Sequence, residues 1–99
     1  MRTILFGKEM PIDSMIKRID EMRKADKERL VGYLFFWYGV RDNDGGLAKM
    51  VVESGATEKI VSFILQAMIC ESKILDEDIT IGGIEILNDN VPEETKARR

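Results

Sequence analysis

The 99-residue chain is long enough for one domain and too short for two, and 33% of its residues are charged, with both signs represented. It has no histidine, which excludes Ser-His and Cys-His nucleophile pairs and removes the commonest nitrogen ligand of protein-bound zinc. Its single cysteine, Cys70, excludes an internal disulfide, and its apolar neighbours favour a small buried hydrophobic side chain.

The two parts of the chain differ in charge. Residues 1–41 carry a net charge of +3 and residues 42–99 a net charge of −6. This asymmetry would suit head-to-tail self-association, although an ordinary solvated surface also accounts for it. The apolar runs at the N-terminus and at 30–40 are too short for a signal peptide or a membrane span, so we expect a cytoplasmic protein without membrane partners.

The first half of the chain predicts two helices after a short β-prone stretch, Thr3–Phe6, which is either an edge strand or an apolar plug. Residues 12–24 have apolar side chains at the spacing of one helix face, with Asp13 or Ser14 as the expected N-cap. Residues 26–40 predict a second helix with Asp26 as its N-cap. Whether these are two helices or one continuous helix stays open.

The composition of residues 41–46 predicts a turn, followed by a short helix over 47–54. Gly55 is expected to end this helix in the left-handed conformation, and Thr57 to cap the next one, at about 58–73. That helix is apolar nearly all round in its first three turns. A helix of this kind is either central and buried or has a second partner.

Two alternating runs flank a Gly-Gly pair at residues 79–87, which predicts a β-hairpin in which Ile81 pairs with Ile84. The expected fold is therefore mostly α (α+β), a small helical domain of about four helices with a C-terminal β-hairpin. We assign residues 1–88 to this single domain and residues 89–99 to a flexible polar tail.

Two acidic segments could be read as chemical sites. An EF-hand alignment of the Asp-Asn-Asp-Gly sequence at 42–45 places Val40 and Val51 at the first and twelfth ligand positions, where neither can coordinate calcium. Carboxylates at 76–78 and at Glu71 lack the pocket signature of a glycosidase. We therefore predict a protein that is not an enzyme, without catalytic residues, metal or cofactor.

Residues 47–64 resemble a helix-turn-helix, because Val51, Gly55 and Val61 have its characteristic spacing, and a hairpin follows as in winged-helix domains. The resemblance implies a DNA-binding regulator. Its candidate DNA-contacting residues here are Thr57, Lys59 and Ser62. The absence of arginine on that helix and the acidic residues before the hairpin argue against phosphate binding, so this remains the alternative interpretation.

Six basic side chains between residues 17 and 29 alternate with acidic ones. This pattern is typical of charge pairing on a solvated helix. The alternative is that they supply anion contacts in a nucleotide-binding or small-ligand module, or bind nucleic acid.

Five of the seven aromatic residues fall between 33 and 38, and five bulky rings in six residues cannot all point inward from one helix. We predict Tyr33, Phe36 and Trp37 as partner-binding residues, with Tyr33 and Trp37 sharing one helix face. The favoured function is a small regulatory, inhibitor or adaptor protein that binds another protein through this face and forms a homo-oligomer.

Overall fold

The computed structural model describes residues 1–89, so all of the predicted polar tail except Asp89 lies outside the described residues. Within this range the chain forms an α+β fold, which confirms the expected class. The elements in chain order are β1 (Arg2–Leu5), β2 (Lys8–Glu9), α1 (Ile12–Asp20), α2 (Lys24–Trp37), α3 (Gly46–Glu53), α4 (Thr57–Leu75), β3 (Ile79–Ile81) and β4 (Ile84–Leu87).

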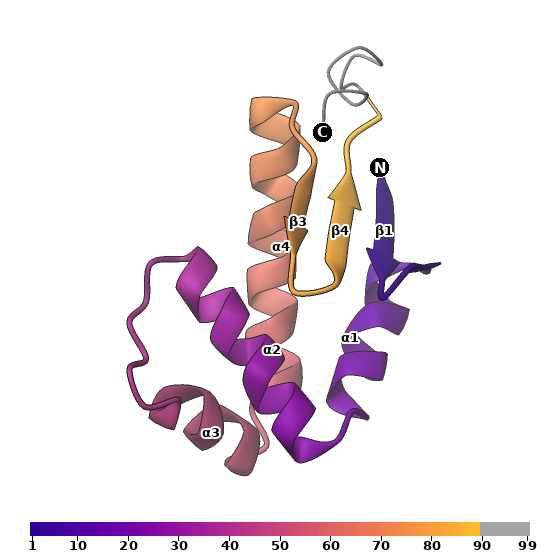
Figure 1. The fold of residues 1–99 in the computed structure, drawn as a ribbon. Coiled ribbons are helices and arrows are strands. Elements are labelled where there is room, and N and C mark those ends of the chain that lie inside the picture. The colour runs from indigo at the N-terminus through magenta and orange to yellow at the C-terminus, as the bar shows by residue number, and fades with distance from the viewer. Residues whose placement is uncertain (90–99) are drawn as a thin grey trace.

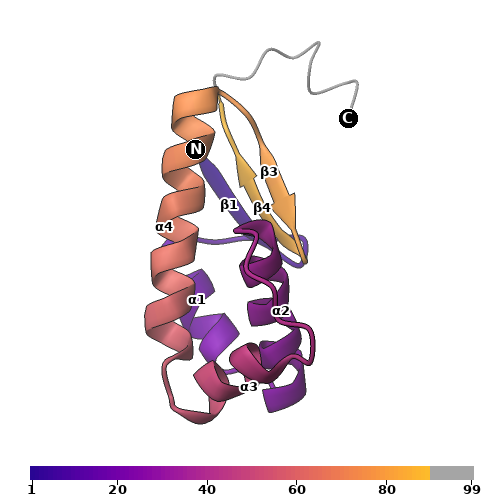
Figure 2. The same cartoon turned by 90° about the vertical axis from the view of Figure 1, so that its left-hand side faces the viewer.

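Helix α4 is the element around which the others are arranged (Figure 1). The sheet lies beside its C-terminal half, and α1, α2 and α3 lie around its N-terminal half (Figure 2). The side chains of Val61, Leu65 and Met68 are fully buried in the core between them. Most of the favourable free energy of this small fold comes from this apolar burial.

The predicted hairpin is confirmed, with Ile81 opposite Ile84 and both turn glycines, Gly82 and Gly83, at positive φ. The sheet is larger than the hairpin alone, because its strand order is β2-β1-β4-β3 and all pairs are antiparallel. Strand β1 is therefore an interior strand rather than an edge strand or a plug. Its pairing with β4 joins the two ends of the described chain.

Helices α1 and α2 are separate, because the chain turns at residues 21–23 between them. The predicted N-caps are wrong. Neither Asp13, Ser14 nor Asp26 occupies a cap position; the residues before the two helices are Pro11 and Arg23, and neither makes a side-chain cap hydrogen bond. Gly55 ends the α3 segment at φ 77°, as expected.

Thr57 is the first residue of α4 rather than its N-cap, which is Ala56. Its side chain is buried, with 1% of its surface exposed, and its hydroxyl oxygen has no hydrogen-bond partner within residues 1–89. The Thr57 side chain is therefore packed in the interior, and its hydroxyl does not cap the helix.

The loop before α3 has a structural role that its sequence did not predict. The two carboxylate oxygens of Asp42 accept hydrogen bonds from the backbone amides of Leu47 and Ala48, each at 2.9 Å. A carboxylate at this end of a helix also interacts favourably with the helix dipole. Asp42 thus anchors the first turn of α3.

The C-terminal end of α4 is tied to the hairpin. Ser72 Oγ donates to the carbonyl of Glu77 at 2.6 Å, and Asn88 Nδ2 donates to the carbonyl of Ser72 at 2.7 Å. The Asn88 amide donates to Asp78 Oδ1 at 2.7 Å. Both Ser72 and Asn88 are buried, so these bonds hold the sheet against α4.

Candidate protein-interaction surface

The aromatic residues of α2 divide between the core and the surface. Phe35 is buried, whereas Phe36 is 81% exposed and Tyr33 is 47% exposed. The arrangement follows from helical geometry, because Leu34 and Phe35 fill the core-facing side and Phe36 points away from it. Exposed apolar side chains indicate an interaction site where they adjoin each other in one patch.

Phe36 and Tyr33 line one hollow between α2 and the loop that leads to α3, with a volume of about 490 Å³. We call it the Phe36 hollow. Gly32 also lines it, and nothing lies within 4 Å of the place where a Cβ on Gly32 would stand. The remaining lining residues are Glu28, Arg29, Val40, Arg41, Asp42, Asn43, Gly45 and Ala48.

Glu28, one of the residues that line the hollow, contains an unsatisfied polar atom. Its Oε1 is buried and has no hydrogen-bond partner among residues 1–89. A buried acceptor without a donor destabilises the fold by about 1–3 kcal/mol, and the cost is larger when the group is charged. Because this oxygen exposes almost no surface, a bound molecule could donate to it only if the Glu28 side chain moved.

Trp37 does not belong to the Phe36 hollow. It is half-buried, packs against the core, and its ring meets that of Tyr38 edge-on at a centroid distance of 4.8 Å. It lines shallow hollows with Glu71 of α4 and with Ile79 of β3. The structure therefore brings Tyr33 and Phe36 together and places Trp37 on the side of α4 and the sheet.

A second apolar surface runs along the outer side of α4. We call it the α4 stripe and define it as Ile60, Phe63, Ala67, Cys70 and Ile74. Phe63 is 71% and Ile74 73% exposed. Cys70 is exposed too, so its interpretation as a buried residue is wrong. The core-facing residues of α4 form a separate set: Thr57, Val61, Ile64, Leu65, Met68 and Ser72.

The sequence did contain a signal for the α4 stripe. Its members follow each other at spacings of three, four, three and four residues, which is one continuous helix face. The core-facing residues of α4 are mostly apolar too. In the sequence the two faces could therefore not be told apart, and the first three turns of the helix had apolar residues on nearly all sides.

The two surfaces adjoin at Val40. An apolar groove of about 310 Å³ lies between the C-terminal end of α2 and α4. It is lined by Phe35, Tyr38, Val40, Ile60, Phe63 and Ile64. Val40 also lines the Phe36 hollow, so exposed apolar surface continues from Phe36 to Phe63.

Tyr38 lines the apolar groove between α2 and α4. Burial, followed by the neighbouring carboxylate of Glu71, raises the pKa of the Tyr38 phenol above its ordinary value. This is the environment of a side chain at the edge of an apolar surface.

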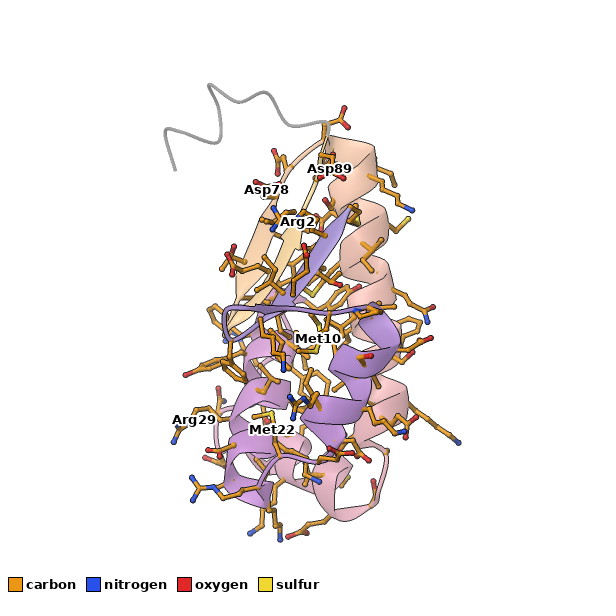
Figure 3. The ribbon with its side chains drawn as sticks, turned by 90° about the vertical axis from the view of Figure 1, so that its right-hand side faces the viewer. Arg2, Met10, Met22, Arg29, Asp78 and Asp89 are labelled. Carbon is orange, nitrogen blue, oxygen red and sulfur yellow. The ribbon has the colours of Figure 1, made fainter. Side chains whose placement is uncertain are left out.

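Some of the basic residues between 17 and 29 are engaged in ion pairs. Arg23 pairs with Asp26 at 3.1 Å, and Lys24 pairs with Glu53 of α3 at 2.9 Å. The Lys24–Glu53 hydrogen bond raises the pKa of Lys24 and lowers that of Glu53. Arg29 extends away from α2 (Figure 3). The paired side chains serve local structure.

The residues of the DNA-binding alternative differ in accessibility. Lys59 is exposed and Ser62 half-buried, and both line a shallow hollow with Glu58 and Phe63. Thr57 is buried and cannot contact a DNA groove, so its assignment as a DNA-contacting residue is wrong. What remains of the motif is the α3–turn–α4 geometry with Gly55 in the turn.

No known protein family, curated protein or solved structure matches this chain. Across residues 1–89, no helix is both long and apolar enough to cross a membrane. In the same range, no group of three or more acidic or cysteine side chains is placed to hold a metal ion. The candidate site is thus defined by its own geometry, as two adjoining apolar surfaces.

Proposed function

We propose that this protein is a small, non-enzymatic regulator, inhibitor or adaptor that binds another protein through the Phe36 hollow. The observation that carries the proposal is the exposure of Phe36 next to Tyr33 at a hollow large enough to receive side chains. Aromatic residues that combine exposure with a neighbouring hollow are the usual anchors of protein interfaces.

The lining of the hollow suggests the chemistry of the partner. Tyr33, Phe36 and Val40 offer apolar contacts. Arg29 and Arg41 add positive charge to the lining, and Glu28 and Asp42 add negative charge. A partner segment that fits would insert an aliphatic or aromatic side chain and carry polar residues of both charge signs around this anchor.

Affinity capture with three baits tests the proposal: the wild-type chain, Phe36→Ser and Met50→Ser. Met50 is 63% exposed on α3 and lines neither the Phe36 hollow nor the apolar groove between α2 and α4. Met50→Ser therefore removes exposed apolar surface elsewhere on the molecule and serves as the matched control. We expect proteins that the wild-type and Met50→Ser baits retain and the Phe36→Ser bait loses. Equal retention by Phe36→Ser would contradict the proposal.

Self-association and a cytoplasmic location are further parts of this proposal. The apolar surface around the α4 stripe lies next to the Phe36 hollow and would remain exposed with a partner seated on the hollow alone. An exposed, unpaired thiol at Cys70 suits a reducing compartment.

The alternative function, a helix-turn-helix DNA-binding regulator, retains one supporting observation, the Gly55 turn between α3 and α4. The exposed residues of the first three turns of α4 include one cation, Lys59, beside Glu58 and Phe63. DNA affinity depends on several phosphate contacts, so this surface supports protein binding better than DNA binding.

A further inference from the structure

The α4 stripe has the spacing of a coiled-coil seam. Positions 60, 67 and 74 correspond to heptad position a, and positions 63 and 70 to position d. The stripe extends for about 21 Å along the helix, at 1.5 Å per residue. Phe63, Cys70 and Ile74 of the stripe are exposed, and Ala67 and Ile60 are half-buried, Ile60 also packing against the core. The fully buried side chains of α4 project from another face of the helix.

We propose that the α4 stripe is the seam along which two copies of this chain pair, with their α4 helices parallel and in register. The inference rests on the self-association in the proposed function and gives it a location and a direction.

The area of the surface matches what a dimer requires. The α4 stripe together with Tyr38 and Val40 exposes roughly 500 Å² of apolar surface, if a fully exposed aromatic side chain presents about 200 Å². A standard interface buries about 800 Å² per partner, and about 65% of a homodimer interface is apolar. The exposed apolar area is therefore close to that of one half of a homodimer.

The shape of the stripe suits a second copy of itself. In a seam of this kind each side chain enters a space between four residues of the facing helix, which requires the same spacing on both helices. Ala67 and Cys70 at the middle of the stripe are small and allow the two helices to approach closely. Phe63 and Ile74 on either side supply most of the area.

The charges beside the stripe select the parallel direction. Helical geometry places Lys59, Gln66 and Lys73 along one side of it and Glu71 along the other. In a parallel pair, heptad geometry places the amide of Gln66 in one copy opposite the carboxylate of Glu71 in the other, and it does not bring the lysines of the two copies together. In an antiparallel pair the two basic sides would face each other, which brings Lys59 toward Lys73 of the second copy.

Sedimentation equilibrium of the full chain under reducing conditions tests the pairing. We expect a mass twice the chain mass of 11.3 kDa for the wild type and for Met50→Ser and Phe36→Ser. Phe63→Ser should have the mass of one chain while circular dichroism shows an unchanged helical fold. A wild-type mass of one chain at several hundred micromolar, or a Phe63→Ser dimer as stable as the wild type, would overturn the proposal.

Oxidation tests the direction. Parallel pairing brings Cys70 of both copies together at a d position, so a mild oxidant such as diamide should give a rapid disulfide-linked dimer. A Cys70→Ser, Met50→Cys variant, whose thiol lies on α3 outside the seam, should cross-link far more slowly. Wild-type dimers that cross-link no faster than this control would overturn the parallel pairing. If Phe36→Ser dimerises but still captures every partner, the Phe36 hollow fails as the partner site while the seam stands.

Discussion

The turn of the hairpin lies directly against Tyr33, so that a Cβ on Gly82 would stand 2.8 Å from Cδ2 of the Tyr33 ring. The same Cβ would be 3.2 Å from Cδ1 of Leu30, which is buried. Gly82, one of the two glycines that shape the turn, therefore also lets the sheet approach α2. It positions one of the two aromatic residues of the Phe36 hollow.

Gly82→Ala should destabilise the protein by about 1–3 kcal/mol, because alanine is strained at a φ of 55° and its methyl group meets Tyr33 and Leu30. Urea denaturation measures this change. The control is Gly7→Ala, which shares a positive φ but has nothing within 4 Å of its Cβ. If Gly82→Ala costs no more than Gly7→Ala, the contact with α2 contributes nothing.

Gly32→Ala should raise the free energy of unfolding by about 0.5–1 kcal/mol, because Gly32 lies inside α2 with a helical φ and open space around its Cβ position. The same denaturation experiment measures it. A destabilised Gly32→Ala variant would show that the Phe36 hollow is narrower at this residue than the structure indicates.

The alkaline titration of Tyr38 should respond to pairing along the α4 stripe. Burial already raises the pKa of this phenol, and a second chain over the stripe would bury it further. In a Tyr33→Phe background, where Tyr38 is the sole tyrosine, we expect a higher pKa for the paired chain than for the chain that also carries Phe63→Ser. Ultraviolet difference spectra measure both; identical values would place Tyr38 outside the paired surface.

DNA binding should be absent at low salt. Lys59 is the one basic residue among the exposed residues of the first three turns of α4, and Thr57 is buried. A titration of random duplex DNA at increasing salt concentration checks this. Binding at low salt that falls steeply as the salt rises would favour the helix-turn-helix alternative.

The elements that the sequence predicted well are those fixed by local chemistry. The Gly82-Gly83 turn between alternating isoleucines specifies its own hairpin, and Gly55 specifies the end of α3. The pairing of β1 with β4 joins residues more than 75 positions apart, such as Leu5 and Ile84. No local pattern encodes such a contact, since it depends on how the helices bring the two strands together.

Only the part of the candidate site that depends on local sequence could be predicted. The crowding of aromatic rings at 33–38 required some to be exposed, and Phe36 and Tyr33 are. Which neighbour each ring meets depends on tertiary packing, so the half-buried position of Trp37 beside α4 was not foreseen. The exposure of Cys70 depends likewise on which of two apolar faces of α4 the other helices cover.

The central claim is that Phe36 anchors a protein partner. Once capture has identified a partner, the most direct test is its dissociation constant for the wild-type chain, Phe36→Ser and Met50→Ser, measured by calorimetric titration. An aromatic anchor contributes at least about 1.4 kcal/mol, so we predict that Phe36→Ser weakens binding about tenfold or more and that Met50→Ser leaves it unchanged. A Phe36→Ser dissociation constant within twofold of the wild-type value would contradict the account.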